Sequence, residues 1–140
     1  EDANARDRGG ATPLFVAVEE NELEILRLLL RYGADPNARD DDKETPLMKV
    51  DEDTSVEMVQ ALIDAGAKVN RTSQNGATAL LRAAEFASAA VVKLLIEAGA
   101  EVNARDEDGW TPLMRAAWAE DIQKVRMLLV AGADVNARNN

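Results

Sequence analysis

The chain has 140 residues, of which 46% are hydrophobic and 30% charged, a composition typical of a folded domain. Its 26 acidic and 16 basic residues give a formal net charge of -10, which argues against nucleic acid or a membrane as a partner and favours a basic or apolar one. Cysteine and histidine are absent, which excludes disulfides, thiolate catalysis, and catalysis or metal binding by histidine.

The first predicted helix begins at Thr12, whose hydroxyl can cap free backbone N–H groups, and Pro13 fits its first turn. Apolar residues follow for about two turns, before the polar run 19–21 ends the helix. A second helix is expected from about Glu22, with leucines at helical spacing, and Gly33 ends it in a left-handed conformation. The turn-forming run 39–42 then predicts a projecting hairpin finger.

The same succession of residues returns every 33 residues. Thr-Pro-Leu at 12–14 recurs at 45–47 and 111–113, with Thr-Ala-Leu at 78–80, and the helix-ending glycine recurs at 66, 99 and 132. Four units follow, which we number 1 to 4: residues 7–39, 40–72, 73–105 and 106–138, with a partial finger at 1–6 and a tail at 139–140. Helices this short are marginal alone, so the units are expected to stack into a single domain covering 1–140.

Three features of the fingers and caps lead to further predictions. Lys43 occupies the finger-turn position that is glycine in the other three units, which predicts a different turn geometry. Thr54 and Glu57 have the spacing of a capping box and predict the start of the second helix of unit 2. The arginines at 6, 39 and 105 precede aspartates, and with the arginine at 138 they are expected to form ion pairs at the finger bases, not a nucleic-acid surface.

Asp51 is the most unusual residue of unit 2, because the other units have valine or alanine at its position. One interpretation is that its carboxylate is pushed toward a helix seam, where it would need Lys49 or Arg82 as a partner. The other is that the first helix ends early and Asp51 stays in solvent. We favour the early ending, because the following residues are typical of a turn.

These residues resemble the ankyrin repeat family. The likeness rests on the 33-residue interval, Thr-Pro-Leu, the paired alanines at 83–84 and 116–117, and Gly-Ala-Asp-Val-Asn-Ala at 132–137, and it covers essentially the whole chain. It implies an all-α fold, an ankyrin-repeat α-solenoid of stacked helix-turn-helix units with β-hairpin fingers. It also implies a concave groove, lined by fingers and first helices, that holds another macromolecule. The family often has histidine after Thr-Pro-Leu; this chain has apolar residues there, at 15, 48, 81 and 114.

The resemblance places the contact positions at the finger tips, just before each Thr-Pro-Leu, and near the end of each first helix. The polar candidates are Asp41, Asp42, Glu44, Glu52, Asp53, Gln74, Asn75, Glu85, Glu107 and Asp108. They differ from unit to unit, as a surface shaped for one target would, although an unconstrained surface would differ in the same way. The carboxylates at 19, 20, 41, 42, 44, 52 and 53 would steer a basic partner, the alternative being ordinary solvated charge.

Three aromatic residues also fall on predicted groove positions. Phe86, Trp110 and Trp118 are of the kind most often found as interface anchors. The alternative is that each ring only packs over the alkyl chains of its neighbours. An apolar anchor of a partner is therefore a second expected contact.

From the sequence we predict a non-catalytic protein–protein interaction module, cytoplasmic, with no cofactor, no metal site and no catalytic residue. The acidic runs 40–44 and 51–53 lie in a line, whereas acid–base catalysis needs groups that converge in an enclosed pocket. The alternative is an engineered or reconstructed ankyrin scaffold with no natural target. The missing cysteine and histidine favour that alternative, and the diversity of the units argues against it. Both end units carry apolar residues, which predicts possible end-to-end self-association.

Overall fold

Seven α-helices and one 3-10 helix form the regular structure of residues 2–140, the part of the chain that the computed structural model describes. In chain order they are α1 (Pro13–Glu19), α2 (Leu23–Arg31), η1 (Pro46–Lys49), α3 (Val56–Asp64), α4 (Ala79–Phe86), α5 (Ala89–Glu97), α6 (Pro112–Trp118) and α7 (Ile122–Val130). Each unit contributes a first and a second helix, as the repeat predicts. None of these helices is long and apolar enough to cross a membrane.

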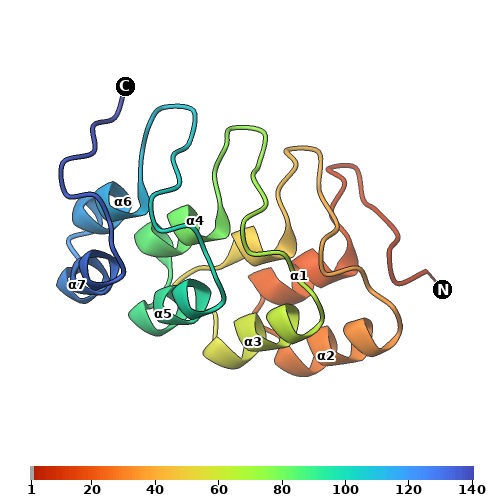
Figure 1. The fold of residues 1–140 in the computed structure, drawn as a ribbon. Helices are drawn as coiled ribbons and strands as arrows, with labels where there is room; N and C mark the ends of the chain where they lie inside the picture. The colour runs from red at the N-terminus through yellow and green to blue at the C-terminus, as the bar shows by residue number, and fades with distance from the viewer. Residues whose placement is uncertain (1) are drawn as a thin grey trace.

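The helices lie in two rows, with the fingers projecting to one side of them (Figure 1). The first helices α1, η1, α4 and α6 form one row, and the second helices α2, α3, α5 and α7 form the other; neighbours in each row are in contact. Leu62, Leu95 and Leu128 hold one repeat position in the second row and are fully buried. The core is therefore continuous across the seams between units, which confirms the stacked all-α solenoid.

The fingers are hydrogen-bonded turns. Each closes with a backbone bond such as that from Asp40 N to Glu44 O, at 3.0 Å. Adjacent fingers are joined by bonds such as those from Gln74 N to Asp42 O, at 2.8 Å, and from Glu107 N to the oxygen of residue 75, at 3.0 Å. Residues 2–140 contain no β-strand, so the fingers are hairpin-shaped turns without the paired strands that the resemblance implied.

A ladder of asparagine side chains joins each unit to the next. Asn70 Nδ2 donates to Gly99 O at 3.0 Å, and Asn70 Oδ1 accepts from Glu101 N at 2.8 Å. The asparagines at 4, 37 and 103 make the same two bonds to the loops that follow the next second helix. The recurrence of asparagine at this interval is thus explained, because its amide satisfies one carbonyl and one N–H group of the neighbouring unit.

Lys43 does not change the geometry of its finger. Its φ of 60° is close to the 76° of Gly76, and Lys43 N donates to Asp40 O at 2.9 Å as Gly76 N donates to Ser73 O at 3.0 Å. The prediction of a different turn was wrong. The lysine adopts the left-handed conformation that the closing hydrogen bonds require, although this conformation is unfavourable for a residue with a Cβ atom.

The predicted helix starts are correct to within one residue, but the predicted caps are partly wrong. Thr12 precedes α1 but makes no side-chain cap hydrogen bond. Helix α3 begins one residue later than the capping box predicted, because Ser55 Oγ accepts from Met58 N at 3.1 Å. Thr54 is buried and instead accepts from Asp51 N at 2.9 Å.

Candidate partner-binding groove

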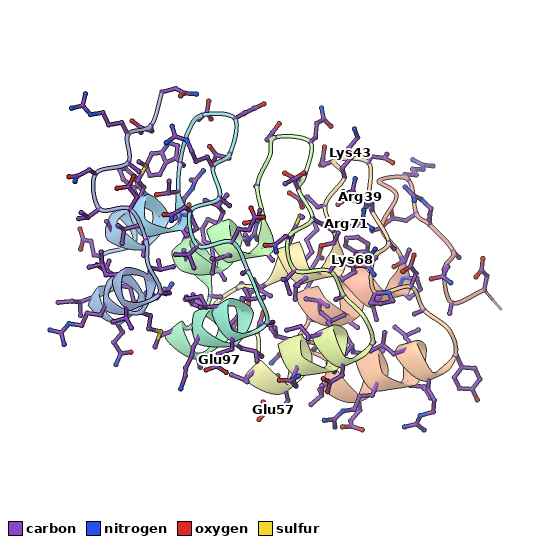
Figure 2. The ribbon with its side chains drawn as sticks, viewed as in Figure 1. Arg39, Lys43, Glu57, Lys68, Arg71 and Glu97 are labelled. Carbon is purple, nitrogen blue, oxygen red and sulfur yellow. The ribbon has the colours of Figure 1, made fainter. Side chains whose placement is uncertain are left out.

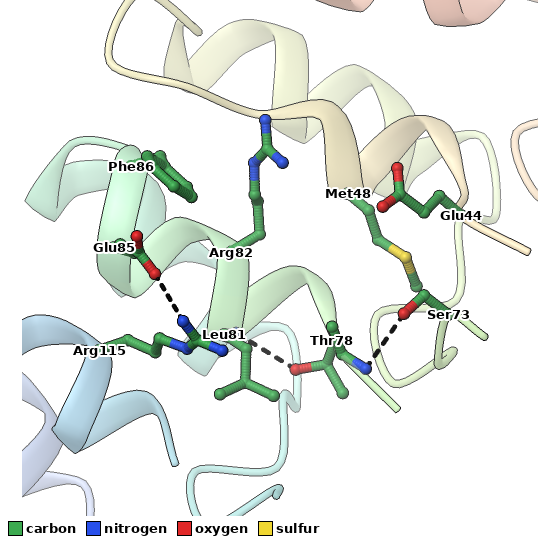
Figure 3. A pocket seen from close by; sticks show the side chains of 10 residues that line it. Glu44, Met48, Ser73, Thr78, Leu81, Arg82, Glu85, Phe86 and Arg115 are labelled. Atoms are coloured by element: carbon green, nitrogen blue, oxygen red, sulfur yellow. Dashed lines mark hydrogen bonds and ion pairs between the residues drawn. The ribbon is translucent and has the colours of Figure 1, made fainter. Parts of the chain in front are cut away.

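A small cavity opens on the first-helix side of units 2 and 3. Its volume is about 160 Å³, and Figure 3 shows the side chains around it. The wall is part apolar and part charged, formed by Glu44, Met48, Ser73, Ala77, Thr78, Leu81, Arg82, Glu85, Phe86 and Arg115. We refer to this cavity and the finger and first-helix surface around it as the groove.

The first helix of unit 2, which borders the cavity, is shortened to one turn. Helix η1 has four residues, whereas α1 and α6 have seven and α4 has eight. The chain leaves it at Val50, and Asp51 Oδ1 then accepts from Asp53 N at 2.9 Å. Local side-chain to backbone bonds of this kind compete with helix formation. The early ending is confirmed: Asp51 is half-buried among its own turn, and neither Lys49 nor Arg82 pairs with it.

Lys49 and the carboxylates of Asp40 and Glu44 form one charged cluster in unit 2. Lys49 Nζ lies 3.2 Å from Asp40 Oδ2 and also pairs with Glu44 Oε2. Burial disfavours the charged ammonium, but the hydrogen bonds and the charges of the two carboxylates outweigh it and raise the pKa of Lys49. Glu44, a predicted contact residue, is therefore already neutralised by a neighbour within its own unit.

An equivalent cluster surrounds Arg115 in unit 4. Its guanidinium lies 2.9 Å from Glu85 Oε1 and 2.7 Å from Asp106 Oδ2, and it stacks 4.6 Å from the Trp110 ring centroid. Trp110 meets Trp118 edge to face, with the centroids 6.1 Å apart. Trp110 is thus held inside this cluster, whereas Trp118 is 71% exposed.

Arg82 holds the same repeat position in unit 3 but lacks the matching carboxylate. Units 2 and 4 have Asp40 and Asp106 at the first position of the unit, where unit 3 has Ser73. Arg82 Nε donates to Val50 O at 3.2 Å, and the guanidinium lies 4.8 Å from the Phe86 ring centroid. No ion pair joins Arg82 to another residue of 2–140, although Glu44 and Glu85 line the same cavity.

The predicted contact residues fall into three places. Glu85 and Phe86 lie with Glu44 around the cavity, and Phe86 is 47% exposed. Trp110 and Trp118 line a second, more open hollow beside residues 137–139. The remaining candidates are exposed, either at the finger tips or in the turn after η1: Asp41, Asp42, Gln74, Asn75, Glu107, Asp108, Glu52 and Asp53.

Arg82 and Arg115 are groove residues that the sequence analysis did not select. A comparison of repeat positions could have found them. The tenth position is basic in units 2, 3 and 4, and of these three units only 2 and 4 have an acidic residue at the first position.

The ion pairs predicted at the finger bases form with other partners than expected. Arg6 lies 3.6 Å from Asp41 of the next finger, while Asp40 and Asp106 pair with residues of the first helices.

The described residues contain no group of three or more side chains that could hold a metal ion.

A family model for ankyrin repeats in three copies matches residues 50–139, and a second model for ankyrin repeats in many copies matches residues 1–48. A comparison with curated proteins found no match. The asparagine ladder, the paired helices and these two matches together show that the chain belongs to the ankyrin repeat family.

Proposed function

We propose that the chain is a non-catalytic module that binds another protein through the groove. Ankyrin repeats are in general protein–protein interaction modules. The observation that carries the proposal is the contrast between Arg82 and its two counterparts, because Lys49 and Arg115 form ion pairs and Arg82, which lines the cavity, forms none among residues 2–140. A partner that supplies an acceptor would complete the same cluster that units 2 and 4 form internally.

The apolar part of the cavity wall is consistent with a second contact, in which an apolar side chain of the partner enters the cavity. Met48 and Leu81 form this part of the wall, and the half-exposed Phe86 stands beside it. Exposed aromatic rings at the edge of a pocket are typical of interface anchors, since their burial contributes much of the binding energy. The partner segment therefore combines an apolar side chain with a nearby carboxylate or carbonyl oxygen.

The size of the cavity supports a macromolecular partner over a small ligand. Its volume of about 160 Å³ is below the roughly 300–1,000 Å³ of small-molecule sites. The carboxylates nearest to it, Glu44 and Glu85, are both engaged in ion pairs, which leaves neither placed as a free general base. The exposed acidic finger tips at 41–42 and 107–108 would add long-range attraction for a basic region of the same partner.

The decisive variant is Ser73→Asp, which gives unit 3 the aspartate of units 2 and 4. The introduced carboxylate would accept the N–H bonds that Ser73 Oγ now accepts from residues 75 and 77 and would pair with Arg82. We expect the fold to be kept and the binding of the partner to be weakened. The partner is identified by affinity capture with the wild-type chain and mass spectrometry, and its affinity for purified variants is then measured by calorimetry.

Thr72→Asp is the matched control, because it adds the same charge one residue away on an exposed side chain. Trp118→Ala and Tyr32→Ala form a second pair of exposed aromatics, one on the groove side and one at the end of α2. We expect Ser73→Asp and Trp118→Ala to weaken binding and the two controls to leave it unchanged. If the two variants of each pair changed the affinity equally, binding through the groove would be contradicted. If no specific partner were captured, a scaffold without a natural target would be favoured.

A further inference from the structure

Four basic side chains lie along the fingers of units 2 and 3, and none of them lines the cavity of the groove. Arg39, Lys43, Lys68 and Arg71 run from the tip of the finger of unit 2 down to the base of the next finger (Figure 2). We call these four residues the basic patch. None of them forms an ion pair or a side-chain hydrogen bond with another residue of the described chain 2–140.

Backbone contacts across one seam hold the basic patch together. Lys68 N donates to Asn37 Oδ1 at 2.8 Å, which places Lys68 beside the segment that contains Arg39. The bond from Gln74 N to Asp42 O, also 2.8 Å, joins the two fingers above it. The patch is therefore a property of the stacked units, although its residues are up to 32 positions apart in sequence.

Lys43 has a local conformational cost that the equivalent residues avoid. The other three fingers have glycine at this position, with φ between 76° and 81°, whereas Lys43 has a φ of 60°. A side chain is unfavourable in this left-handed conformation, where glycine is not. The lysine is thus kept at a position where local stability favours glycine.

Lys68 and Arg71 also replace residues that suit their positions better. The equivalents of Lys68 are Asp35, Glu101 and Asp134, and both aspartates accept a hydrogen bond from the N–H two residues on, which a lysine cannot do. Arg71 stands where the other units have alanine, and its Nε is buried without a hydrogen-bond partner among residues 2–140. An unpaired buried donor is unfavourable.

Three independent departures from the repeat thus each reduce local stability, and all three add a positive charge to one surface of an acidic chain. Several locally unfavourable residues occur close together mainly at functional sites. We propose that the basic patch is a second binding surface, which takes a short acidic segment of a protein through its carboxylates. Asp42 is exposed beside Lys43 and the whole chain carries a charge of -10, so a long polyphosphate chain would meet repulsion beyond the four cations.

The test measures binding of a fluorescein-labelled ten-residue peptide, in which glutamate alternates with glycine, by fluorescence anisotropy at low ionic strength. The key variant combines Lys43→Gly, Lys68→Gln and Arg71→Ala, all within unit 2, and the first and last of these restore the residue that the other units have. We expect its affinity to fall about tenfold or more, because three charge contacts are lost. Its thermal midpoint should be unchanged or higher, so that lost binding cannot be ascribed to unfolding. Added salt should weaken the wild-type complex.

The matched control removes three positive charges from the second helices with Arg31→Gln, Lys93→Gln and Arg126→Gln, all at exposed positions. It should bind the peptide nearly as well as the wild type, and a glutamine-glycine peptide should not bind. Phe86→Ala should leave peptide binding intact, which separates this surface from the groove. The proposal is overturned if the wild type does not bind, if both triple variants lose binding equally, or if a single-stranded oligonucleotide of equal charge binds as tightly as the peptide.

Discussion

Lys124 is a charged residue at a position that is otherwise apolar. Its equivalents Met58 and Val91 are fully buried, and Lys124 itself is only 4% exposed. Its Nζ donates to the carbonyls of residues 83 and 84, at 3.3 and 3.1 Å, in the last turn of α4. Desolvation by burial is the largest influence on the pKa of Lys124 and lowers it, although the nearby charges of Asp121 and Glu85 act in the opposite direction.

This lowered pKa predicts how stability depends on pH. While Lys124 carries its proton, the folded state bears the cost of burying the charge. As the pH rises toward 10.5, the folded chain loses that proton first, so the contribution of Lys124 to stability increases. Lys49 has a raised pKa, and its contribution decreases only as the pH rises above 10.5.

The measurement is the free energy of unfolding of the wild type minus that of Lys124→Met, by urea denaturation at several pH values up to 10.5. This difference should rise with pH. Lys68→Met removes an exposed lysine and reports the effect of net charge alone, so the same difference taken for Lys68→Met should lack that rise. A difference that stays flat for Lys124→Met would contradict the buried charge.

At the scale of the element, the four second helices differ in their N-caps. Ser55, Ser88 and Asp121 each accept a hydrogen bond from an N–H of the first turn through the side chain. Glu22 holds the equivalent position before α2 and makes no such bond. A serine or aspartate oxygen reaches these N–H groups where the longer glutamate does not, so α2 begins with one more unsatisfied donor than its counterparts.

We therefore expect Glu22→Ser to raise the free energy of unfolding by about 0.5–1 kcal/mol. Ser88→Ala, at the same position before α5, should lower it by about 1 kcal/mol, since it removes a cap that is already made. Chemical denaturation of the two variants and the wild type gives both values. Suppose that Glu22→Ser leaves the free energy of unfolding unchanged or lowers it, while Ser88→Ala lowers it by the expected amount. The missing cap would then not weaken the start of α2.

How far the sequence predicts an element depends on whether the deciding contacts are local. The interval of 33 residues was sufficient for the paired helices, because apolar spacing and the helix-ending glycines are local signals. The start of α3 was misplaced by one residue, because Thr54 and Ser55 can both cap and only the turn around Asp51 decides between them. The turn of Lys43 was misjudged because closure of the finger outweighed its own preference.

The sequence analysis selected candidate contact residues but not the pairing of the charges among them. Phe86 and Trp118 were selected from their place in the repeat; both are exposed, and their contact with a partner remains a prediction. The pairing of Arg115 with Glu85 joins residues 30 positions apart in different units, which spacing within one unit does not reveal. Four of the acidic candidates, Asp41, Asp42, Glu52 and Asp53, are exposed and remain predictions for a basic partner.

For the whole molecule, stability depends on contacts between units. The ladder formed by the asparagines at 4, 37, 70 and 103 crosses each seam with two hydrogen bonds. Apolar side chains are exposed in both end units, among them Ile25 in unit 1 and Val130 in unit 4, the latter 90% exposed. End-to-end self-association remains a prediction, which sedimentation at rising concentration tests.

Asn136 offers an internal control for the ladder, because it continues the asparagine repeat but is exposed with no following unit among the described residues. Asn70→Ala removes one bond of 3.0 Å and one of 2.8 Å across the seam between units 2 and 3, and should lower the free energy of unfolding by about 1–2 kcal/mol. Asn136→Ala should change it by less than about 0.5 kcal/mol, since it breaks no bond of this kind. Urea unfolding of the two variants and the wild type measures both changes in the free energy of unfolding. Equal losses would mean that asparagine acts through the conformation of its own turn, whereas a loss confined to Asn70→Ala would mean that the ladder couples neighbouring units.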